Sequence, residues 1–275
     1  MPELPEVECI ARVLRRGTTD FPPLPGRRIE RVSLRWPRHI AQPSPSTFRR
    51  NIRGRTILDV QRRGKYLVFP LDKFTMLIHL RMSGDLSMAP SSAPAGRFDR
   101  TVFMLEDQWE LRFSDARKFG KISLVSDPQR VLGKLGPEPL DKGFTAKDLA
   151  SSLSSRRRAL KPLLLDQSFL AGMGNIYVDE GLFLAGLHPL RRTDSILEQE
   201  TRSLWRGIRA ALRAGLRHNG ASIDWVYRGG EFQNQFRVYQ RTGKPCYKCK
   251  TAIQRIVVAQ RGTHFCPQCQ PENGQ

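Results

Sequence analysis

Four cysteines in two close pairs carry the strongest chemical signal in the chain. They are spaced Cys246-x2-Cys249-x16-Cys266-x2-Cys269, and the fifth cysteine, Cys9, stands apart near the N-terminus. Two such pairs, separated by a hairpin-length stretch, can close a tetrahedral tetrathiolate site around zinc. Because sulfur fills all four positions, none stays open for water, and we predict one structural Zn²⁺. Iron and disulfides are the alternatives that this spacing leaves open.

The residues between the two cysteine pairs predict a two-stranded hairpin. Ile253–Val258 has the composition of one strand, Arg261–Thr263 opens the next, and Gly262 is expected to form the turn. A zinc-bound hairpin can hold Arg261 rigidly toward a phosphate. A solvated turn arginine explains the same spacing equally well.

The N-terminal residues Met1-Pro2-Glu3-Leu4-Pro5-Glu6 allow a second chemistry. Removal of Met1 would leave a secondary amine on Pro2. An α-amino group has an unperturbed pKa near ~7.7–8.0, against ~10.4 for lysine, and is therefore neutral far more often. A neutral amine can attack a sugar aldehyde carbon and form a Schiff base, with Glu3 and Glu6 placed to transfer protons. A helix start without any chemistry is the alternative interpretation.

An amphipathic helix over residues 5–16 is expected to position this terminus. Its apolar residues recur at helical spacing and form one stripe. The stripe consists of Val7, Ile10, Ala11 and Leu14. Gly17 suits the end of the helix. Cys9 lies beside the stripe, so we interpret it as a packing residue.

Beyond this helix the apolar pattern divides the chain. Residues 27–126 alternate with period two in short runs between Gly, Pro and Asp turns, which is typical of a sandwich or barrel. A stretch rich in Pro and Gly follows, and after it the apolar period becomes helical. The predicted fold class is α+β with two domains. The expected boundaries are a catalytic β-sandwich domain over 1–130, a linker over 131–144, a helical domain over 145–240 and a zinc finger over 241–275.

Two features of the helical part are specific predictions. Thr145 and Asp148 resemble a capping box that starts a helix, with Asp in place of the usual Glu. A long apolar stripe predicts a later helix, with Gly220 as its cap. The stripe consists of Leu197, Thr201, Leu204, Ile208, Leu212 and Leu216.

The charge balance points to a polyanionic partner. The 275-residue chain has 46 Lys and Arg against 26 Asp and Glu, a net charge of +20. Residues 1–130 hold 24 basic and 14 acidic residues and the remainder 22 and 12, so each part carries +10. Two equally basic parts suit nucleic acid, although solubility alone also explains a high charge. No apolar run approaches the ~20 residues that span a bilayer, and no signal segment opens the chain, so we expect a cytoplasmic protein without a membrane partner.

Six motifs in chain order, together with the N-terminus and the cysteines, resemble the formamidopyrimidine-DNA glycosylase family of bacterial repair enzymes. The match covers the whole chain. The motifs are Arg62–Leu67, His79–Gly84, Ser114–Gly120, Leu135–Leu140, Gly172–Tyr177 and Gln260–Cys266. Each motif alone is weak, but six in the correct order are highly specific. The resemblance implies a helix–two-turn–helix in the helical domain, with its turn at Gly172–Tyr177.

The resemblance also implies a bifunctional glycosylase and AP lyase that excises oxidised purines from double-stranded DNA and acts at abasic sites, as a monomer. Pro2 would attack C1′ of the damaged nucleotide, Glu3 would be the main acid/base with Glu6 assisting, and β,δ-elimination would follow. Phosphates around the lesion would be bound by Lys65 and Arg261, counted with the catalytic group, and by His79, Asn175 and Tyr239. The void left by the everted base would be filled by Met82, Arg117 and Phe119. Ser222 begins the segment to Phe232 that would cap the everted base, and this segment is shorter than in some members.

The chain departs from the family pattern in one of these loops. The family often has Pro-Arg-Arg-Phe where this chain has Ala116-Arg117-Lys118-Phe119. Lys118 keeps the positive charge and loses the planar fork, so a bidentate phosphate contact is not expected there.

Two other functions remain as alternatives. An endonuclease VIII-like enzyme would prefer oxidised pyrimidines, against which Leu4 and the Arg117 and Phe119 pair argue. A non-catalytic zinc-finger protein that binds damaged DNA would share the basic charge and the zinc. Such a protein has no need of Pro2 and Glu3, and both are present.

Overall fold

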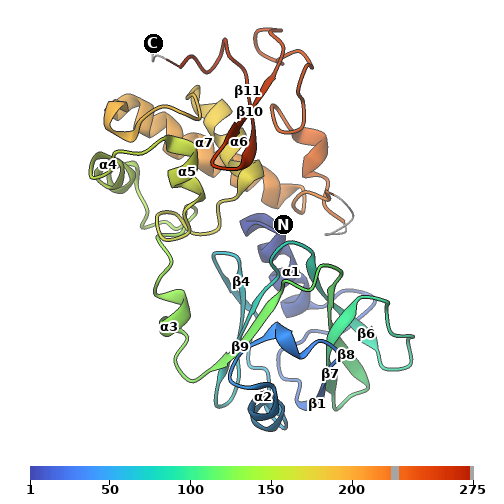
Figure 1. Ribbon diagram of the computed structural model, residues 1–275. Coiled ribbons are helices and arrows are strands. Elements are labelled where there is room, and N and C mark those ends of the chain that lie inside the picture. Colours follow the sequence, from blue (N-terminus) through green and yellow to red (C-terminus); the bar gives the residue numbers. More distant parts are fainter. Residues whose placement is uncertain (224–228, 273–275) are drawn as a thin grey trace. The chain divides into compact units, whose positions relative to one another are not determined.

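The computed structural model describes residues 1–223 and 229–272, which fold into two compact units (Figure 1). Unit 1 comprises Met1–Lys134 with Ser222–Gly230, and unit 2 comprises Leu135–Ala221 with Glu231–Gln275. The division after Lys134 falls inside the Pro- and Gly-rich stretch 131–144. Unit 1 is built mainly from strands and unit 2 mainly from helices, so the predicted α+β class is confirmed.

Helix α1 (Leu4–Arg16) opens unit 1, as predicted. The four residues of its apolar stripe are all buried, and Cys9 is buried beside them. Gly17 ends the helix at a φ of 71°, a left-handed value that glycine tolerates. A Cβ at this position would lie within 2.8 Å of the backbone of residues 21–23, so the turn after α1 also needs the missing side chain.

Two sheets face each other across the core of unit 1, and this confirms the predicted β-sandwich. The four-stranded sheet has the order β1 (Ile29–Leu34), β7 (Asp99–Leu105), β8 (Trp109–Asp115), β6 (Gly84–Pro90). The five-stranded sheet has the order β2 (Ile40–Gln42), β9 (Lys121–Val125), β5 (Thr75–His79), β4 (Tyr66–Pro70), β3 (Gln61–Arg63). All neighbours are antiparallel except β2 and β9.

One apolar cluster joins the sheets to the helices of unit 1. Helix α2 (Pro45–Ile52) buries Phe48 and Ile52 in it, and α1 buries its stripe. Phe48 meets Phe103 of β7 edge to face, with ring centres 6.4 Å apart. The short elements η1 (Pro37–His39) and α3 (Gln129–Leu132) complete the unit.

The register of the strands brings three loops to one end of the sandwich, which we call the loop end. His79 at the end of β5 pairs with Tyr66 and with Lys121, so the β3–β4 turn and the start of β9 lie beside it. In the other sheet, Asp115 at the end of β8 pairs with Gly84 at the start of β6. The loops 64–65, 80–83 and 116–120 therefore project from the same end.

The described part of unit 2 contains four α-helices: α4 (Ala146–Ser154), α5 (Leu160–Leu165), α6 (Asn175–Ala185) and α7 (Glu198–Arg217). The capping box of α4 is confirmed, because Thr145 and Asp148 exchange backbone-to-side-chain hydrogen bonds of 2.8 and 3.3 Å. Two short turns, η2 (Thr193–Ser195) and η3 (Phe232–Gln235), flank α7. Within the described ranges, no helix combines the length and apolarity that crossing a bilayer requires.

Helix α7 follows its predicted stripe at four of the six positions, and Leu216 in its last turn is only partly buried. Thr201, Leu204, Ile208 and Leu212 are buried, but Leu197 precedes the helix and is 63% exposed. Its side chain is outside the stripe because the chain reaches helical geometry only at Glu198. Glycines let α7 pack closely on α6, since a Cβ on Gly207 would lie 2.5 Å from a backbone oxygen of α6.

The zinc-finger hairpin consists of β10 (Gln254–Val258) and β11 (Arg261–Phe265). The predicted turn at Gly262 is wrong. Gly262 pairs with Val257 inside the ladder, and the turn is made by Ala259 and Gln260 at φ values of 47° and 61°. A two-residue hairpin turn of this kind needs left-handed backbone at both positions, which usually favours Gly or Asn. Ala259 and Gln260 are neither, so the sequence carries no signal for a turn at these residues.

Candidate functional site

The start of α1 gathers the predicted nucleophile and its two carboxylates. Pro2, Glu3 and Glu6 are all buried, whereas Met1 is exposed. The Glu3 backbone amide donates a 2.8 Å hydrogen bond to the Glu6 carboxylate, which caps the helix. Leu4 beside them is fully buried, so the core of unit 1 fixes the position of this terminus.

Lys65 and His79 lie together at the loop end of unit 1. Lys65 follows Gly64, whose φ of 57° makes the tight β3–β4 turn, and its side chain is only 5% exposed. His79 ends the neighbouring strand β5, and its ring meets the Tyr66 ring edge to face at 4.7 Å.

His79 is held as a neutral hydrogen-bond donor. Burial, together with the positive charges of Arg81 and Lys65, lowers its pKa to about 3. Its Nδ1 accepts a 3.0 Å hydrogen bond from the Arg81 backbone amide, so the single ring proton is assigned to Nε2. His79 can therefore donate to an oxygen without carrying charge.

Asp115 links the loop that carries Met82 to the loop that carries Arg117 and Phe119. The Ser83 hydroxyl donates to the Asp115 carboxylate, and the amides of Arg117 and Gly120 donate to it at 3.2 and 2.7 Å. Burial of this carboxyl opposes ionisation, but hydrogen bonds from His39, Ser83 and Gly120 hold its pKa at about 2. One buried charge therefore fixes both loops.

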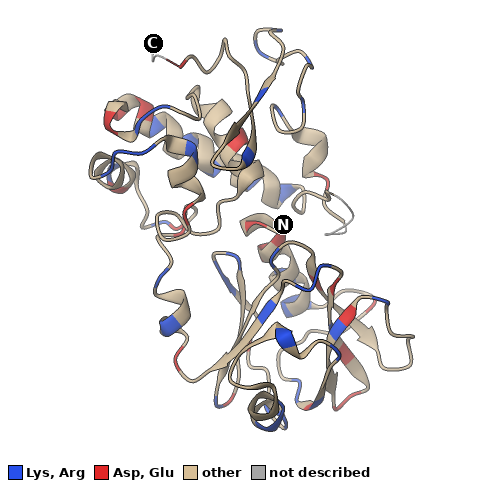
Figure 2. Ribbon diagram, viewed as in Figure 1, with Lys and Arg blue, Asp and Glu red and all other residues tan. Residues whose placement is uncertain are grey.

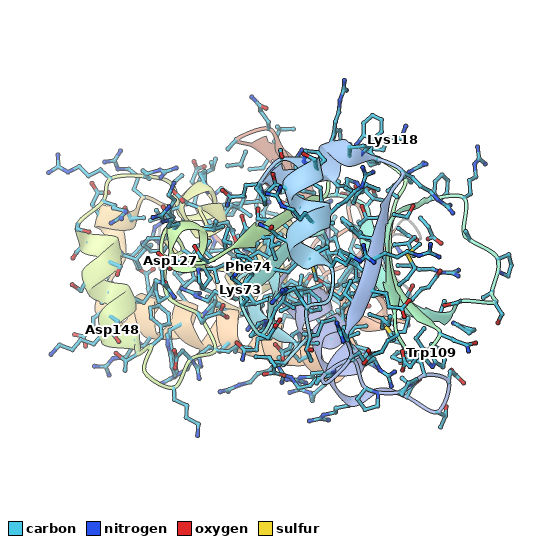
Figure 3. The ribbon with its side chains drawn as sticks, turned by 90° about the horizontal axis from the view of Figure 1, so that it is seen from below. Lys73, Phe74, Trp109, Lys118, Asp127 and Asp148 are labelled. Atoms are coloured by element: carbon cyan, nitrogen blue, oxygen red, sulfur yellow. The ribbon has the colours of Figure 1, made fainter. Side chains whose placement is uncertain are left out.

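The segment 36–39 supports the same loop from the other side. The ammonium of Lys118, a residue labelled in Figure 3, lies 4.4 Å from the centre of the Trp36 ring. His39 Nε2 lies 3.3 Å from the Asp115 carboxylate. Lys118, at the position where the resembling family often has arginine, thus makes a cation–π contact within the unit. Phe119 remains 51% exposed, with the Arg117 guanidinium 5.1 Å from its ring centre.

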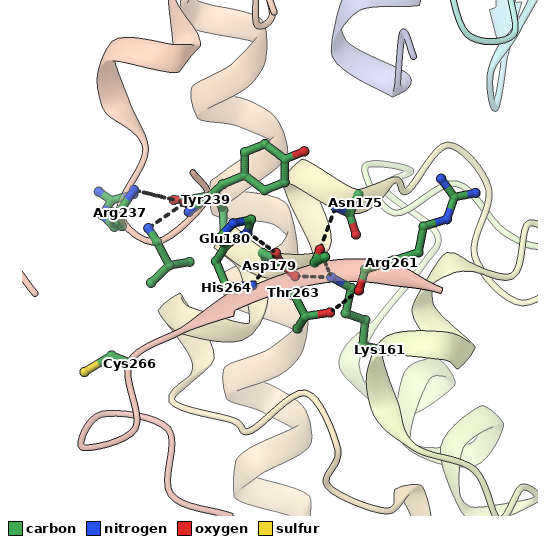
Figure 4. Close-up of polar contacts among 12 residues, drawn as sticks. Lys161, Asn175, Asp179, Glu180, Arg237, Tyr239, Arg261, Thr263, His264 and Cys266 are labelled. Atoms are coloured by element: carbon green, nitrogen blue, oxygen red, sulfur yellow. Dashed lines mark hydrogen bonds and ion pairs between the residues drawn. The ribbon is translucent and has the colours of Figure 1, made fainter. Parts of the chain in front are cut away.

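Unit 2 holds Asn175 and Arg261 through one backbone carbonyl. Gly262 O accepts hydrogen bonds from Asn175 Nδ2 at 2.9 Å and from Lys161 Nζ at 3.2 Å (Figure 4). Lys161 also donates to Asp179 at 2.6 Å, and both side chains are fully buried. Arg261 itself is exposed on the hairpin next to this anchored glycine.

Two consecutive acidic residues of α6 fix the rest of this cluster. Asp179 accepts the backbone amide of His264 at 2.9 Å and thereby ties β11 to the helix. Glu180 accepts the amides of Arg237, Val238 and Tyr239 at 2.9–3.0 Å. Burial raises the pKa of Glu180, while these amide hydrogen bonds lower it. Tyr239 is thus held with its ring 5.0 Å from that of His264.

Ser222 lies at one end of the predicted base-capping segment. Its hydroxyl accepts a 2.9 Å hydrogen bond from the Gly230 amide. Residues 224–228, on which the prediction of a short cap depends, lie outside the described residues.

The sequence did not reveal the buried ionisable side chains that position these residues. They are His39, Asp115, Lys161, Asp179 and Glu180. A signal for two of them was available, because Asp179 and Glu180 interrupt a helix that is otherwise largely apolar. Charged residues are almost never fully buried unless they are paired, so that interruption indicates internal partners.

The four paired cysteines converge on one point, as predicted. All four Sγ atoms lie within 4.8 Å of one another. Three of the Sγ–Sγ distances are 3.4, 3.5 and 3.9 Å. Tetrahedral zinc with Zn–S bonds of ~2.3 Å requires edges of about 3.8 Å, and a disulfide requires about 2.05 Å. The geometry fits one structural zinc and excludes disulfides between these pairs.

Fold and site together define a zinc-containing protein whose two units present basic and polar side chains suited to phosphates. Three family models match the chain. The formamidopyrimidine-DNA glycosylase N-terminal domain matches residues 1–122, and the H2TH (helix–two-turn–helix) domain of the same enzyme matches residues 135–226. A zinc finger found in FPG and IleRS matches residues 243–271.

Full-length relatives agree with these matches. A formamidopyrimidine-DNA glycosylase of Herpetosiphon aurantiacus is 45% identical over 98% of this chain and 100% of its own length. A namesake from Symbiobacterium thermophilum is 43% identical over 98% of this chain and 90% of its own. The chain belongs to the formamidopyrimidine-DNA glycosylase family.

Solved structures show the same fold. MutM bound to DNA containing carbocyclic 8-oxo-G superposes with a TM-score of 0.90 at 36% identity, over 98% of this chain and 100% of that one. Lactococcus lactis FPG bound to DNA containing FAPY-dG gives the same TM-score and identity over the same shares of the two chains.

The tetrathiolate site predicts one zinc per chain. Cys266→Ser should lose the zinc and with it the hairpin, because the metal is the principal link between the two cysteine pairs. The matched control is Cys9→Ser, which removes a cysteine buried on α1 and should keep one zinc. Metal content by mass spectrometry distinguishes the two variants, and a zinc-free native protein would contradict the assignment.

The buried, neutral state of His79 predicts a flat titration across physiological pH. Its folded pKa of about 3 is below the ordinary value of 6.5. The unfolded chain therefore binds the extra proton first, and the stability that His79 contributes is lost as pH falls from 6.5 toward 3. Imidazole ¹⁵N NMR should show the Nε2–H tautomer from pH 8 to 5, whereas a midpoint between 6 and 7 would refute this environment.

The Asp115 network predicts that one substitution loosens two loops. Asp115→Asn should reduce the free energy of unfolding by about 1–3 kcal/mol, because an amide replaces one of the two acceptor oxygens by an NH2 donor. Ser83→Ala removes one donor and should cost less. Hydrogen exchange of residues 116–120 should accelerate in Asp115→Asn, and unchanged protection there would show that the loop is held elsewhere. In the native protein, the contribution of the Asp115 carboxylate to the free energy of unfolding should disappear as pH falls from about 4 toward 2.

Proposed function

We propose that this chain is a bifunctional DNA glycosylase and AP lyase that excises oxidised purines, with the amine of Pro2 as its nucleophile. The observation that carries the proposal is the burial of two carboxylates, Glu3 and Glu6, beside Pro2 at the start of an anchored helix. The relatives are named formamidopyrimidine-DNA glycosylases, which supports the proposed base excision. The lesions bound in the neighbouring structures, 8-oxo-G and FAPY-dG, support the substrate class.

The reaction requires removal of Met1, which is exposed. The freed Pro2 amine attacks C1′ of the damaged nucleotide, the bond to the base breaks, and the base leaves with a proton supplied by an acid. Glu3 is the proposed donor of that proton. It then takes the proton that the Pro2 nitrogen loses after its attack and delivers it to O4′, so that the C1′–O4′ bond breaks and the ring-opened Schiff base forms. Successive β- and δ-elimination then expels both flanking phosphates, and hydrolysis of the Schiff base frees Pro2.

Phosphates near the lesion are proposed to be held by two kinds of group. Lys65 and Arg261 supply positive charge, which gives salt-dependent affinity without sequence preference. His79 and Asn175 supply neutral N–H donors, and Tyr239 a hydroxyl. The zinc takes no part in the reaction and holds the hairpin that carries Arg261.

Eversion of the damaged base leaves a void in the duplex that protein side chains must fill. Met82, Arg117 and Phe119 are the proposed fillers, because they project from two loops that Asp115 joins. The exposure of Phe119 supports this role, since a core residue of the sandwich would be buried.

Bacterial relatives support action in the cytoplasm on chromosomal DNA, and we propose that one chain acts alone. An endonuclease VIII-like preference for oxidised pyrimidines is the second candidate for the substrate. A binder without catalysis is less favoured, because it has no use for the buried carboxylates at Pro2.

Borohydride trapping tests this function directly. The native protein, an 8-oxoguanine:C duplex and borohydride should give a covalent adduct that mass spectrometry maps to Pro2. Trapping with an abasic duplex but not with 8-oxoguanine would keep the lyase and reject the oxidised-purine substrate. Absence of an adduct on both duplexes would reject the enzyme in favour of a DNA-binding protein.

The role of Glu3 is tested by Glu3→Gln, which should retain DNA affinity and lose base excision by about 10²–10⁴-fold. Glu8→Gln is the matched control on the same helix, because Glu8 forms ion pairs with Arg12 and Arg62. Excision that persists in Glu3→Gln would show that another group transfers the proton.

A further inference from the structure

A groove in unit 1 is lined by arginines that the proposed reaction does not use. It lies between β1 and α2 and includes the short segment that follows α2. Its lining consists of Arg28, Glu30, Arg31, Val32, Ser46, Arg49, Arg50, Arg53, Gly54 and Glu106. Five arginines against two glutamates give this surface a local charge of +3, and we call it the arginine groove.

The strand register places the arginine groove at the opposite end of the sandwich from the loop end. Ile29 at the start of β1 pairs with Leu105, whereas Leu34 pairs with Thr101 near the start of β7. That start is next to Ser114, which adjoins the 116–120 loop. In Figures 1 and 2, α2 and the start of β1 accordingly lie at the far end of the unit from the N-terminus.

The arginines of the groove lack acidic partners among the residues that the structure describes. All five are exposed, and none takes part in an ion pair of 4.0 Å or less. Elsewhere in the same unit, by contrast, Arg12 and Arg62 pair with Glu8 and Arg55 pairs with Asp72. Clustered unpaired charge of one sign lowers stability by repulsion, so an anionic ligand is the simplest compensation.

Local structure explains only part of this cluster. Arg49 and Arg50 lie in the last turn of α2, where the helix dipole favours positive charge. Arg28 directly precedes β1 and Arg31 lies near its start, so the dipole of α2 does not explain why they lie in the groove. Gly54 brings the two groups together, because its φ of 74° turns the chain and its amide donates to Ile29 O at 2.7 Å. A Cβ at Gly54 would lie 3.5 Å from the Arg28 guanidinium.

We propose that the arginine groove binds the phosphate backbone of a second segment of duplex DNA. Arginine forks match phosphate oxygens and bind them without reading sequence. The lining contains no aromatic side chain, so it offers no platform on which the bases of a single strand could stack. Its one apolar residue, Val32, does not provide the buried anchor typical of a protein partner.

A second DNA contact would affect how the protein searches DNA for lesions. A chain bound to one segment through the loop end can touch another segment through the groove before it dissociates. Glu30 and Glu106 reduce the charge of the groove, which keeps this second contact weak and salt-sensitive. The groove thus supports transfer between DNA segments and does not compete with lesion binding.

In the test, the lesion-binding site is first occupied by covalently trapped DNA, so that only the arginine groove is left to bind a second duplex. Native protein is trapped with borohydride on a short lesion duplex, and binding of a second, undamaged, fluorescent duplex is measured by anisotropy at several salt concentrations. The trapped native complex should bind the second duplex. The triple variant Arg49→Gln, Arg50→Gln, Arg53→Gln should bind it at least about tenfold more weakly, with a salt slope reduced by about 3.

The control variant Arg16→Gln, Lys73→Gln, Arg97→Gln removes the same charge from exposed positions of unit 1 and should keep second-duplex binding. Single-turnover excision should be unchanged in both variants. No binding by the trapped native complex, equal loss in the control, or preference for polyglutamate over duplex DNA would each overturn the proposal.

Failure of the proposed reaction is distinguishable from failure of the groove. If no adduct forms, the stoichiometry of undamaged duplex on untrapped protein tests the groove alone. Two duplexes per native chain and one per Arg49, Arg50, Arg53 triple variant would support it. One duplex on both would refute it.

Discussion

A buried carboxylate must find donors, and this requirement fixes the two loops that carry Met82, Arg117 and Phe119, the hairpin that carries Arg261 and the segment at Tyr239. Asp115 collects its donors from both loops that hold Met82, Arg117 and Phe119. Asp179 and Glu180 collect theirs from the zinc hairpin and from the segment that ends at Tyr239. An unpaired buried charge is far more costly than a paired one, so the loops cannot move without losing these bonds.

In this arrangement, the residues that position the loops differ from most of the residues proposed to contact DNA. The charges that organise the protein are buried, and several of the groups proposed to meet DNA, such as Arg261 and Phe119, are exposed beside them. His79 combines both tasks, because the contact that engages Nδ1 also leaves the proton on Nε2. Rigid support of this kind reduces the conformational entropy that binding would otherwise cost.

Positive charge is distributed over the surface in two functional patterns. At the loop end, the cations Lys65, Arg81, Arg117 and Lys118 stand beside the neutral donor His79, which suits a defined geometry around one lesion. In the arginine groove, the cations are many and exposed, which suits loose contact with any backbone.

Local spacing alone predicted the features that depend on neighbours in the chain. The four zinc ligands, the α1 stripe, the Thr145 capping box and the alternation of the sandwich strands all follow from short-range periodicity. Resemblance to a family, and not spacing, singled out Lys65, His79 and Asn175. The hairpin turn escaped prediction because Ala259 and Gln260 adopt left-handed backbone that their side chains do not signal. Only the tertiary structure decided the partners of Asp115 and Lys161, the tautomer of His79 and the convergence of five arginines on one groove. These depend on which segments meet in space, and contacts between residues far apart in sequence leave no periodic trace in the chain.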